Sequence, residues 1–150
     1  MTNTSIGNLA AGFIAAALSV LLIHQGMQWV LTQTGLVKLE PWSFKPVGPF
    51  SVPTLVNSIF WGGLWGLLFA LVWDKVPGSA MWIKGLIYGF VILLISNWTL
   101  LPLIKGKIFG QANQALFAGF VPARMLAGLL ILGAFGAGTG AIYSLLRSRD

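Results

Sequence analysis

The chain has 150 residues, of which 57% are apolar and only 8% are charged. An ordinary soluble domain carries about a quarter charged residues, so this composition leaves too few to cover the surface of a soluble protein. The net charge is +6, but the Lys and Arg residues are scattered through short connections, which favours contact with anionic lipid headgroups and argues against nucleic-acid binding.

Four apolar segments approach or exceed the roughly 20 residues that a helix needs to cross the hydrocarbon core of a membrane. They cover about residues 6–31, 54–73, 80–104 and 119–146. Tryptophans lie towards the ends of these segments, where amphipathic rings prefer the headgroup level. We therefore predict an all-α integral membrane protein, a bundle of four transmembrane helices that forms a single domain over residues 1–150.

The three connections between these segments differ in character. The first, 32–53, is long and rich in proline and aromatic residues, so we expect it to rest irregularly in the membrane interface. The second is a tight turn around Pro77 and Gly78, which predicts that the second and third helices are antiparallel neighbours. The third, 105–118, mixes apolar and polar residues in a pattern compatible with a short interfacial helix.

The orientation in the membrane should follow the excess of Lys and Arg on the cytoplasmic side. Both faces carry nearly equal numbers of basic residues, so this rule does not choose between them. A short basic tail, here with Arg147 and Arg149, is more often cytoplasmic. We expect a prokaryotic inner membrane with both termini in the cytoplasm.

Polar residues gather at one set of helix ends. In an antiparallel four-helix arrangement, the end of the first helix, the start of the second, the end of the third and the start of the fourth meet at the same membrane face. We predict a polar crevice there, lined by His24, Gln25, Gln28, Asn57, Ser58, Asn97 and Arg124. His24 and Gln28 are four residues apart and should project from the same face of their helix.

This crevice has a functional and a structural interpretation. Polar side chains are costly against lipid, so they favour a binding or permeation vestibule for an anionic or carbonyl-bearing ligand. Arg124 and the helix N-termini would add positive charge to it. Alternatively, the amides and hydroxyls only hydrogen-bond one helix to another, which contributes about 1 kcal/mol each in membrane bundles.

His24 is the single histidine of the chain. As a haem ligand it would need a second axial residue from another subunit; it could also act as a proton-linked switch or as a hydrogen-bonded structural histidine. No carboxylate lies within a predicted span, and proton-coupled transporters usually depend on one. Cysteine is absent, which excludes thiolate metal sites, and we expect neither a metal nor a cofactor.

Small residues predict where helices approach one another closely. We expect the second and fourth helices to cross through Gly62, Gly63, Gly66, Gly133, Gly136 and Gly140. The first segment offers a further small-residue surface around Gly12. Internal packing needs about two such surfaces, so the third is a candidate site for a partner, either another membrane subunit or a copy of the chain. The runs 63–66 and 133–136 are also similar, which raises an internal duplication as a hypothesis.

These features favour a small non-enzymatic membrane protein that acts as an accessory or assembly subunit or as a homo-oligomer. The alternative is a small-molecule, lipid or ion binding or permeation protein that uses the polar crevice at the face of the first and third connections. A membrane enzyme or haem-bearing subunit is a further alternative, which the scarcity of acids, cysteine and histidine disfavours. Membrane lipids are expected partners in every case.

Overall fold

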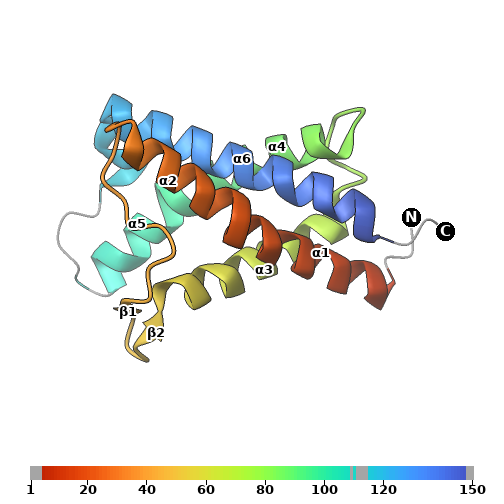
Figure 1. Cartoon of the computed structure of the whole chain (residues 1–150), viewed down its shortest axis with the longest axis horizontal. Coiled ribbons are helices and arrows are strands. Elements are labelled where there is room, and N and C mark those ends of the chain that lie inside the picture. The colour runs from red at the N-terminus through yellow and green to blue at the C-terminus, as the bar shows by residue number, and fades with distance from the viewer. Residues whose placement is uncertain (1–4, 109, 111–114, 148–150) are drawn as a thin grey trace.

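The computed structural model describes residues 5–108, 110 and 115–147. This part of the chain is mostly helical, with one short antiparallel hairpin (Figure 1). Its α-helices are α1 (Ile6–Ser19), α2 (Gln25–Gln33), α3 (Thr54–Val72), α4 (Met81–Ile92), α5 (Leu101–Leu103) and α6 (Pro122–Leu146). The segments η1 (Val20–His24), η2 (Leu93–Leu100) and η3 (Ile104–Ile108) are π-helical, η4 (Leu116–Phe120) is a 3-10 turn, and the strands are β1 (Pro46–Val47) and β2 (Val52–Pro53).

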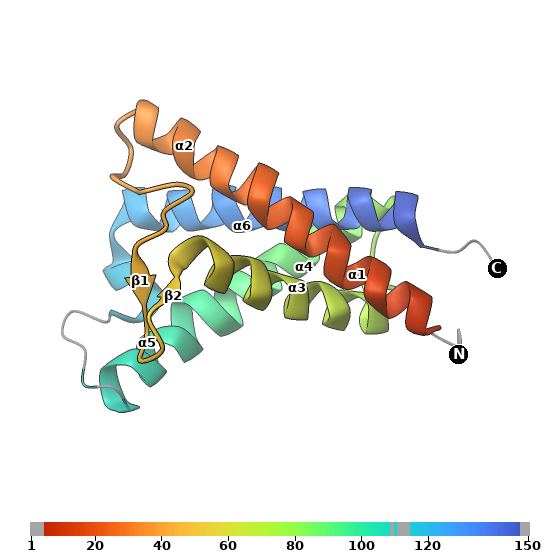
Figure 2. The same ribbon diagram turned by 60° about the horizontal axis from the view of Figure 1, so that its bottom comes forward.

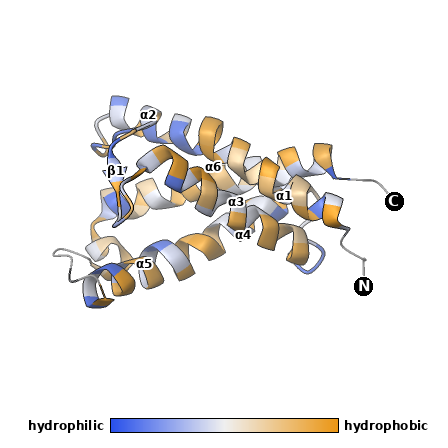
Figure 3. Cartoon of the chain, turned by 90° about the horizontal axis from the view of Figure 1, so that it is seen from below, coloured by the Kyte–Doolittle hydropathy of each residue, from blue (hydrophilic) through white to orange (hydrophobic). Residues whose placement is uncertain are grey.

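Four continuous helices are long and apolar enough to cross a membrane. They run over Ile6–Gln33, Thr54–Val72, Met81–Ile108 and Pro122–Leu146. Each coincides with a predicted segment, and the largest difference is that the third helix continues past residue 104 to Ile108. Figure 3 shows that the middle parts of these helices are mostly hydrophobic, whereas hydrophilic residues gather towards the end that carries α2 and β1.

The four helices pack as two pairs. α1 lies against α3 and α4 lies against α6, while α1 also contacts α6 and so joins the pairs (Figures 1 and 2). α3 and α4 meet mainly through side chains, for example where Tyr88 Oη donates to Trp65 O at 2.8 Å. The predicted crossing of the second helix on the fourth is wrong for the described chain, because the glycines of α3 face α1.

Glycine makes the closest approaches in both pairs. A side chain on Gly66 would overlap Gly12 O in α1, and a side chain on Gly136 would overlap Gly85 O in α4. All of the glycines predicted for helix packing are buried and would meet a neighbouring helix: Gly62, Gly63, Gly66, Gly133, Gly136 and Gly140. The small-residue surface around Gly12 is covered by α3 in the same way. These surfaces are therefore engaged within the chain.

The third long helix changes its winding along its length. It begins as α4, widens into the π-helical segment η2, passes Pro102 in α5 and widens again in η3. Because proline has no backbone N–H to donate, a carbonyl on the preceding turn loses its partner and the helix loosens there. From α4 towards α5 this helix diverges from α3 (Figure 2).

The first connection folds back onto the end of the bundle. Its strands pair Pro46 with Pro53 and Val47 with Val52. The hairpin is held at the start of α3 by Thr54. Its backbone N–H and its hydroxyl both donate to the carbonyl oxygen of Lys45, the residue before β1. The predicted interfacial helix of the third connection falls partly outside the described residues, since 109 and 111–114 are not among them. The described part of the connection contains most of η3 and the start of the turn η4.

Candidate functional site

A cavity of about 720 Å³ lies between α3 and the third long helix, and residues of η1 and α6 close its inner side. Its polar lining residues are His24, Asn57, Ser58, Ser96, Asn97 and Lys105. Its apolar walls come mainly from Trp61, Leu64, Trp65, Leu68, Ile92, Leu100, Leu101 and Ile104. Val47 of the hairpin also lines it, which places the first connection at its outer end.

The polar and apolar linings lie at different depths along the helices. Asn57 and Ser58 lie in the first turns of α3, whereas Leu68 lies about 15 Å further along, at a rise of about 1.5 Å per residue. On the facing helix, Ile92 is deepest and Lys105 lies nearest the end. The hydrogen-bonding groups therefore lie in the half beside the connections, called here the polar half, which also contains Leu100, Leu101 and Ile104. The inner half, towards the middle of the bundle, is apolar.

The structure brings together four of the seven side chains predicted for the crevice. His24, Asn57, Ser58 and Asn97 line the cavity, although they come from three different long helices. The predicted set did not contain Ser96, which lines the cavity beside Asn97 from the π-helical segment η2. The sequence feature that indicates an irregular helix near Ser96 is Pro102, because a proline disturbs the regular winding of a helix.

All three π-helical segments of the described chain contribute to this cavity. η1 supplies His24, η2 supplies Ser96 and Asn97 from the facing helix, and η3 supplies Ile104 and Lys105. Segments of this kind are rare in proteins and occur frequently at functional sites. In η1 the wider winding accompanies a bond from outside the helix, since Trp42 Nε1 donates to Leu21 O at 2.9 Å.

Gln25 and Gln28 do not line the cavity, and their side-chain amides contact the Nδ1 side of the His24 ring. Their side-chain nitrogens each lie 3.4 Å from His24 Nδ1. The ring of His24 also meets the edge of Phe135 at 87°, with 6.1 Å between centroids. The imidazole is thus oriented by two amides and one aromatic ring before any ligand is considered.

The first connection reaches this histidine through Gln25. The backbone N–H of Trp42 donates to Gln25 Oε1 at 2.8 Å, and Gln25 is buried. Trp42 has a φ of 52°, a left-handed conformation that costs energy in a residue with a large side chain. Its two hydrogen bonds to η1 and α2 hold this conformation, so the loop is fixed to the helix that carries His24.

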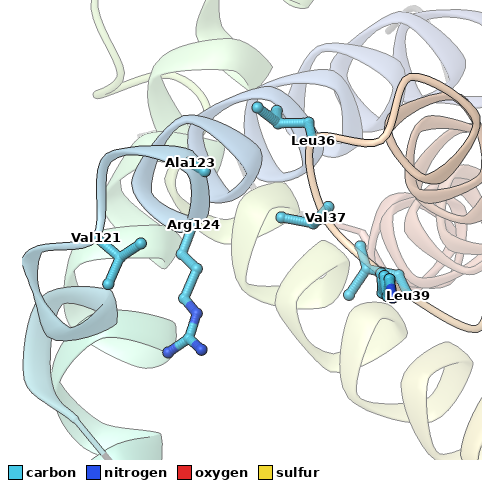
Figure 4. Close-up of a pocket in the computed structure, with 7 residues that line it drawn as sticks. Leu36, Val37, Leu39, Val121, Ala123 and Arg124 are labelled. Carbon is cyan, nitrogen blue, oxygen red and sulfur yellow. The ribbon is translucent and has the colours of Figure 1, made fainter.

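Arg124 lies apart from the cavity. It is exposed and borders a separate groove of about 440 Å³, together with Lys38 and the apolar residues Leu36, Val37, Leu39, Val121 and Ala123. Figure 4 shows Arg124 and Val121 across this groove from the 36–39 segment. The predicted convergence of Arg124 with His24 is therefore not found, because the start of α6 packs beside the end of α2 and away from α3.

The charges around the cavity are of one sign. Lys105 is the ionised side chain of its lining, and no carboxylate belongs to that lining. Glu40 pairs with Lys45 at the exposed surface. Within the described ranges, no group of three or more His, Asp or Glu residues is arranged to hold a metal ion.

Comparison of the chain with protein-family models, with curated proteins and with solved structures found no match.

Proposed function

We propose that the chain spans a membrane four times and retains an amphiphilic small molecule or a lipid in the cavity between α3 and the third long helix. The observation that carries this proposal is the order of the lining: the inner half is apolar, and the hydrogen-bonding groups lie in the half beside the connections, which also contains Leu100, Leu101 and Ile104. A molecule with a polar head and an apolar tail matches that order when it lies parallel to the helices.

The size and the walls of the cavity fit this role. Ligand pockets usually measure about 300–1,000 Å³ and are mostly apolar with a few placed polar groups. The cavity falls within that range at about 720 Å³, and Trp61, Leu64 and Leu68 supply the apolar surface. Trp61 and Leu68 are exposed at the surface of α3, so the tail of a ligand has a lateral path from surrounding lipid.

We further propose that this membrane is a prokaryotic inner membrane and that both termini lie in the cytoplasm. The polar half of the cavity would then face the opposite side. Because the chain has no cysteine, Ser5→Cys and Gln33→Cys each introduce a unique thiol at opposite ends of the first long helix. A membrane-impermeant maleimide should label Gln33→Cys in intact cells and Ser5→Cys only after lysis; the reverse pattern would invert the orientation.

The role of accessory subunit or homo-oligomer stays a prediction and loses part of its support. It depended on a small-residue surface in excess of internal needs, and the glycines around Gly12, Gly66 and Gly136 are engaged within the chain. The haem-bearing alternative also stays a prediction, and it lacks a second axial ligand in the lining of the cavity.

The proposal is tested by what the purified protein carries. We would extract the chain in a mild detergent, record a native mass spectrum and analyse an organic extract of the sample. The double substitution Asn57→Leu with Asn97→Leu removes two amides from the polar half of the cavity. The matched control is Gln33→Leu, which removes an exposed amide at the end of α2.

We expect the wild type and the control to retain the same amphiphile and the double variant to lose most of it without a lower unfolding midpoint. A protein that carries no small molecule, or a double variant that retains it as well as the wild type does, would refute the proposal. Discrete co-purifying polypeptides in place of a small molecule would favour the accessory-subunit prediction.

A further inference from the structure

The orientation of the Gln25 amide follows from the backbone of the first connection. A backbone N–H can only donate, so the atom of Gln25 that faces the Trp42 N–H at 2.8 Å must be the carbonyl oxygen Oε1. The other end of the same amide, Nε2, then faces His24 Nδ1 at 3.4 Å. Because Nε2 can only donate, His24 Nδ1 must act as the acceptor.

An accepting Nδ1 determines which nitrogen of His24 carries the proton. Gln28 Nε2 lies at the same distance and offers a second donor to this atom. A neutral imidazole has one donor and one acceptor nitrogen, so its proton is on Nε2. The edge contact with Phe135 holds the plane of the ring.

The Nε2–H group is left for the cavity. The hydrogen bonds of His24 with the described residues involve Nδ1 alone. Across the described ranges, Tyr143 Oη is the one fully buried side-chain polar atom without a hydrogen-bond partner, so Nε2 is not sealed inside the protein. His24 itself lines the cavity.

Among the described residues, no hydrogen bond joins His24 Nε2 to another polar side chain of the lining. The hydroxyl of Ser58 donates to Thr54 O at 2.9 Å and so points its proton away from the cavity ligand. No carboxylate belongs to the lining, and Lys105 adds a positive charge at the outer end. The polar half of the cavity therefore offers a preset N–H donor and a cation.

We infer that Gln25, oriented by Trp42 of the first connection, is a positioning residue that presents His24 Nε2–H to the ligand, so that the cavity selects amphiphiles with an oxygen acceptor in the head. This inference rests on the proposed function and names the ligand class. The acceptor is a carbonyl oxygen or an anionic phosphate oxygen. A head that only donates leaves the Nε2–H unpaired and is disfavoured.

The single histidine makes this inference directly measurable. Protein labelled with ¹⁵N-histidine gives signals from one imidazole, and long-range ¹H–¹⁵N spectra distinguish the two neutral tautomers. We expect the Nε2–H tautomer in the wild type. In Gln25→Glu an accepting carboxylate replaces the donor, so Nδ1 should gain a proton. The matched control Gln33→Glu, on an exposed amide of the same helix, should leave the wild-type spectrum unchanged.

The ligand class is tested on the same signal with three probes. We expect 2-tridecanone, whose head only accepts, to shift the Nε2 resonance and tridecane, which has no head, to leave it in place. His24→Leu should weaken binding of 2-tridecanone by roughly threefold to tenfold, the value of one hydrogen bond. A stronger response to monododecyl phosphate that Lys105→Gln removes would assign an anionic head, and a response to the ketone alone would assign a neutral carbonyl.

The outcomes separate this inference from the proposed function. A wild-type protein that retains its amphiphile but carries the His24 proton on Nδ1 overturns the inference and leaves the proposed function standing. Equal responses to 2-tridecanone and tridecane also overturn it. An Nε2–H tautomer in a protein that retains no amphiphile and responds to no probe overturns both.

Discussion

The two ends of the bundle are built from different residues and pack differently. At the end near the termini, α4 and α6 touch through glycines, where a side chain on Gly140 would overlap Met81 O. At the end near the first connection, the third long helix diverges from α3 (Figure 2). The cavity lined by both helices lies there. The comparison indicates that the spacing of glycine decides where two helices close and where they leave room for a ligand.

Aromatic and basic residues complete the closed end. Lys84 Nζ donates to Trp73 O at 3.1 Å and lies 5.2 Å from the centre of the Trp73 ring, while Arg147 lies 4.4 Å from it. The last turn of α3 thus receives a cation near its free carbonyls, which stabilises a helix C-terminus. The open end instead places His24 and Asn97 in the cavity, where water or a ligand must satisfy them.

The largest loss of stability is expected when a methyl group is added at the glycine contact between α4 and α6. Gly136→Ala places a methyl group against Gly85 O and 2.8 Å from Gly89 Cα, and neither backbone can move freely. We expect the free energy of unfolding in detergent to fall by about 2 kcal/mol or more. The control is Gly26→Ala, where an added Cβ meets nothing within 4 Å and should be neutral or stabilising. Equal stabilities of the two variants would show that the pairing of α4 with α6 does not depend on this contact.

A smaller effect is expected at the open end from Trp42→Ala. The substitution removes the bond from Trp42 Nε1 to Leu21 O, which is worth about 1 kcal/mol, together with the packing of the indole. Faster amide hydrogen exchange should appear in residues 34–45 and in η1, with little change in α4. Trp82→Ala, on an exposed tryptophan at the closed end, is the matched control. Exchange that spreads evenly over both ends would contradict a local role for the loop.

Two tyrosines allow the stabilising effect of one hydrogen-bonded hydroxyl group to be compared with that of one unpaired hydroxyl group. Tyr88 Oη bridges α4 to α3 through Trp65 O, whereas Tyr143 Oη is buried and has no partner among the described residues. We expect Tyr88→Phe to lower the free energy of unfolding by about 1 kcal/mol and Tyr143→Phe to be neutral or slightly stabilising. Thermal unfolding of both variants in the same detergent measures the difference. The opposite ranking would mean that the pairs are not joined through Tyr88.

The smallest effect is expected from the surface of the closed end. Lys84→Met removes the donor to Trp73 O and the cation beside the indole ring. We expect a loss of roughly 0.5–1 kcal/mol, since both interactions are partly exposed to solvent. Lys75→Met, on the exposed turn next to α3, is the control and should change the unfolding midpoint less. A larger loss for Lys75→Met would contradict a capping role for Lys84.

The pairing of helices also bears on the hypothesis of internal duplication. In each half, the second helix carries a glycine that meets a glycine of the first helix, Gly66 with Gly12 and Gly136 with Gly85. The two runs that are similar in sequence therefore occupy similar places in their pairs. The halves differ in the next residue of the contact: four residues after Gly85, α4 has a second glycine, Gly89, against Gly136, whereas four residues after Gly12, α1 has Ala16 against Gly66.

Much of this architecture could be predicted from the sequence. Long runs of apolar residues without charge can only be stable as helices away from water, so the four helices and nearly all of their ends follow from composition. The gathering of polar residues at one end follows from the alternation of helix direction. His24, Asn57 and Asn97 were therefore within reach of sequence reasoning.

Only the tertiary structure decided which helices pair and which polar groups share a cavity. Several glycine surfaces compete for the same partners, and backbone contact between α3 and α1 excludes the predicted crossing of α3 on α6. Ser96 joins Asn97 in the lining from the π-helical segment η2, whose winding a regular helical period does not predict. Arg124 was separated from the cavity for a related reason: the direction of a side chain depends on the neighbour of its helix, which local sequence does not specify.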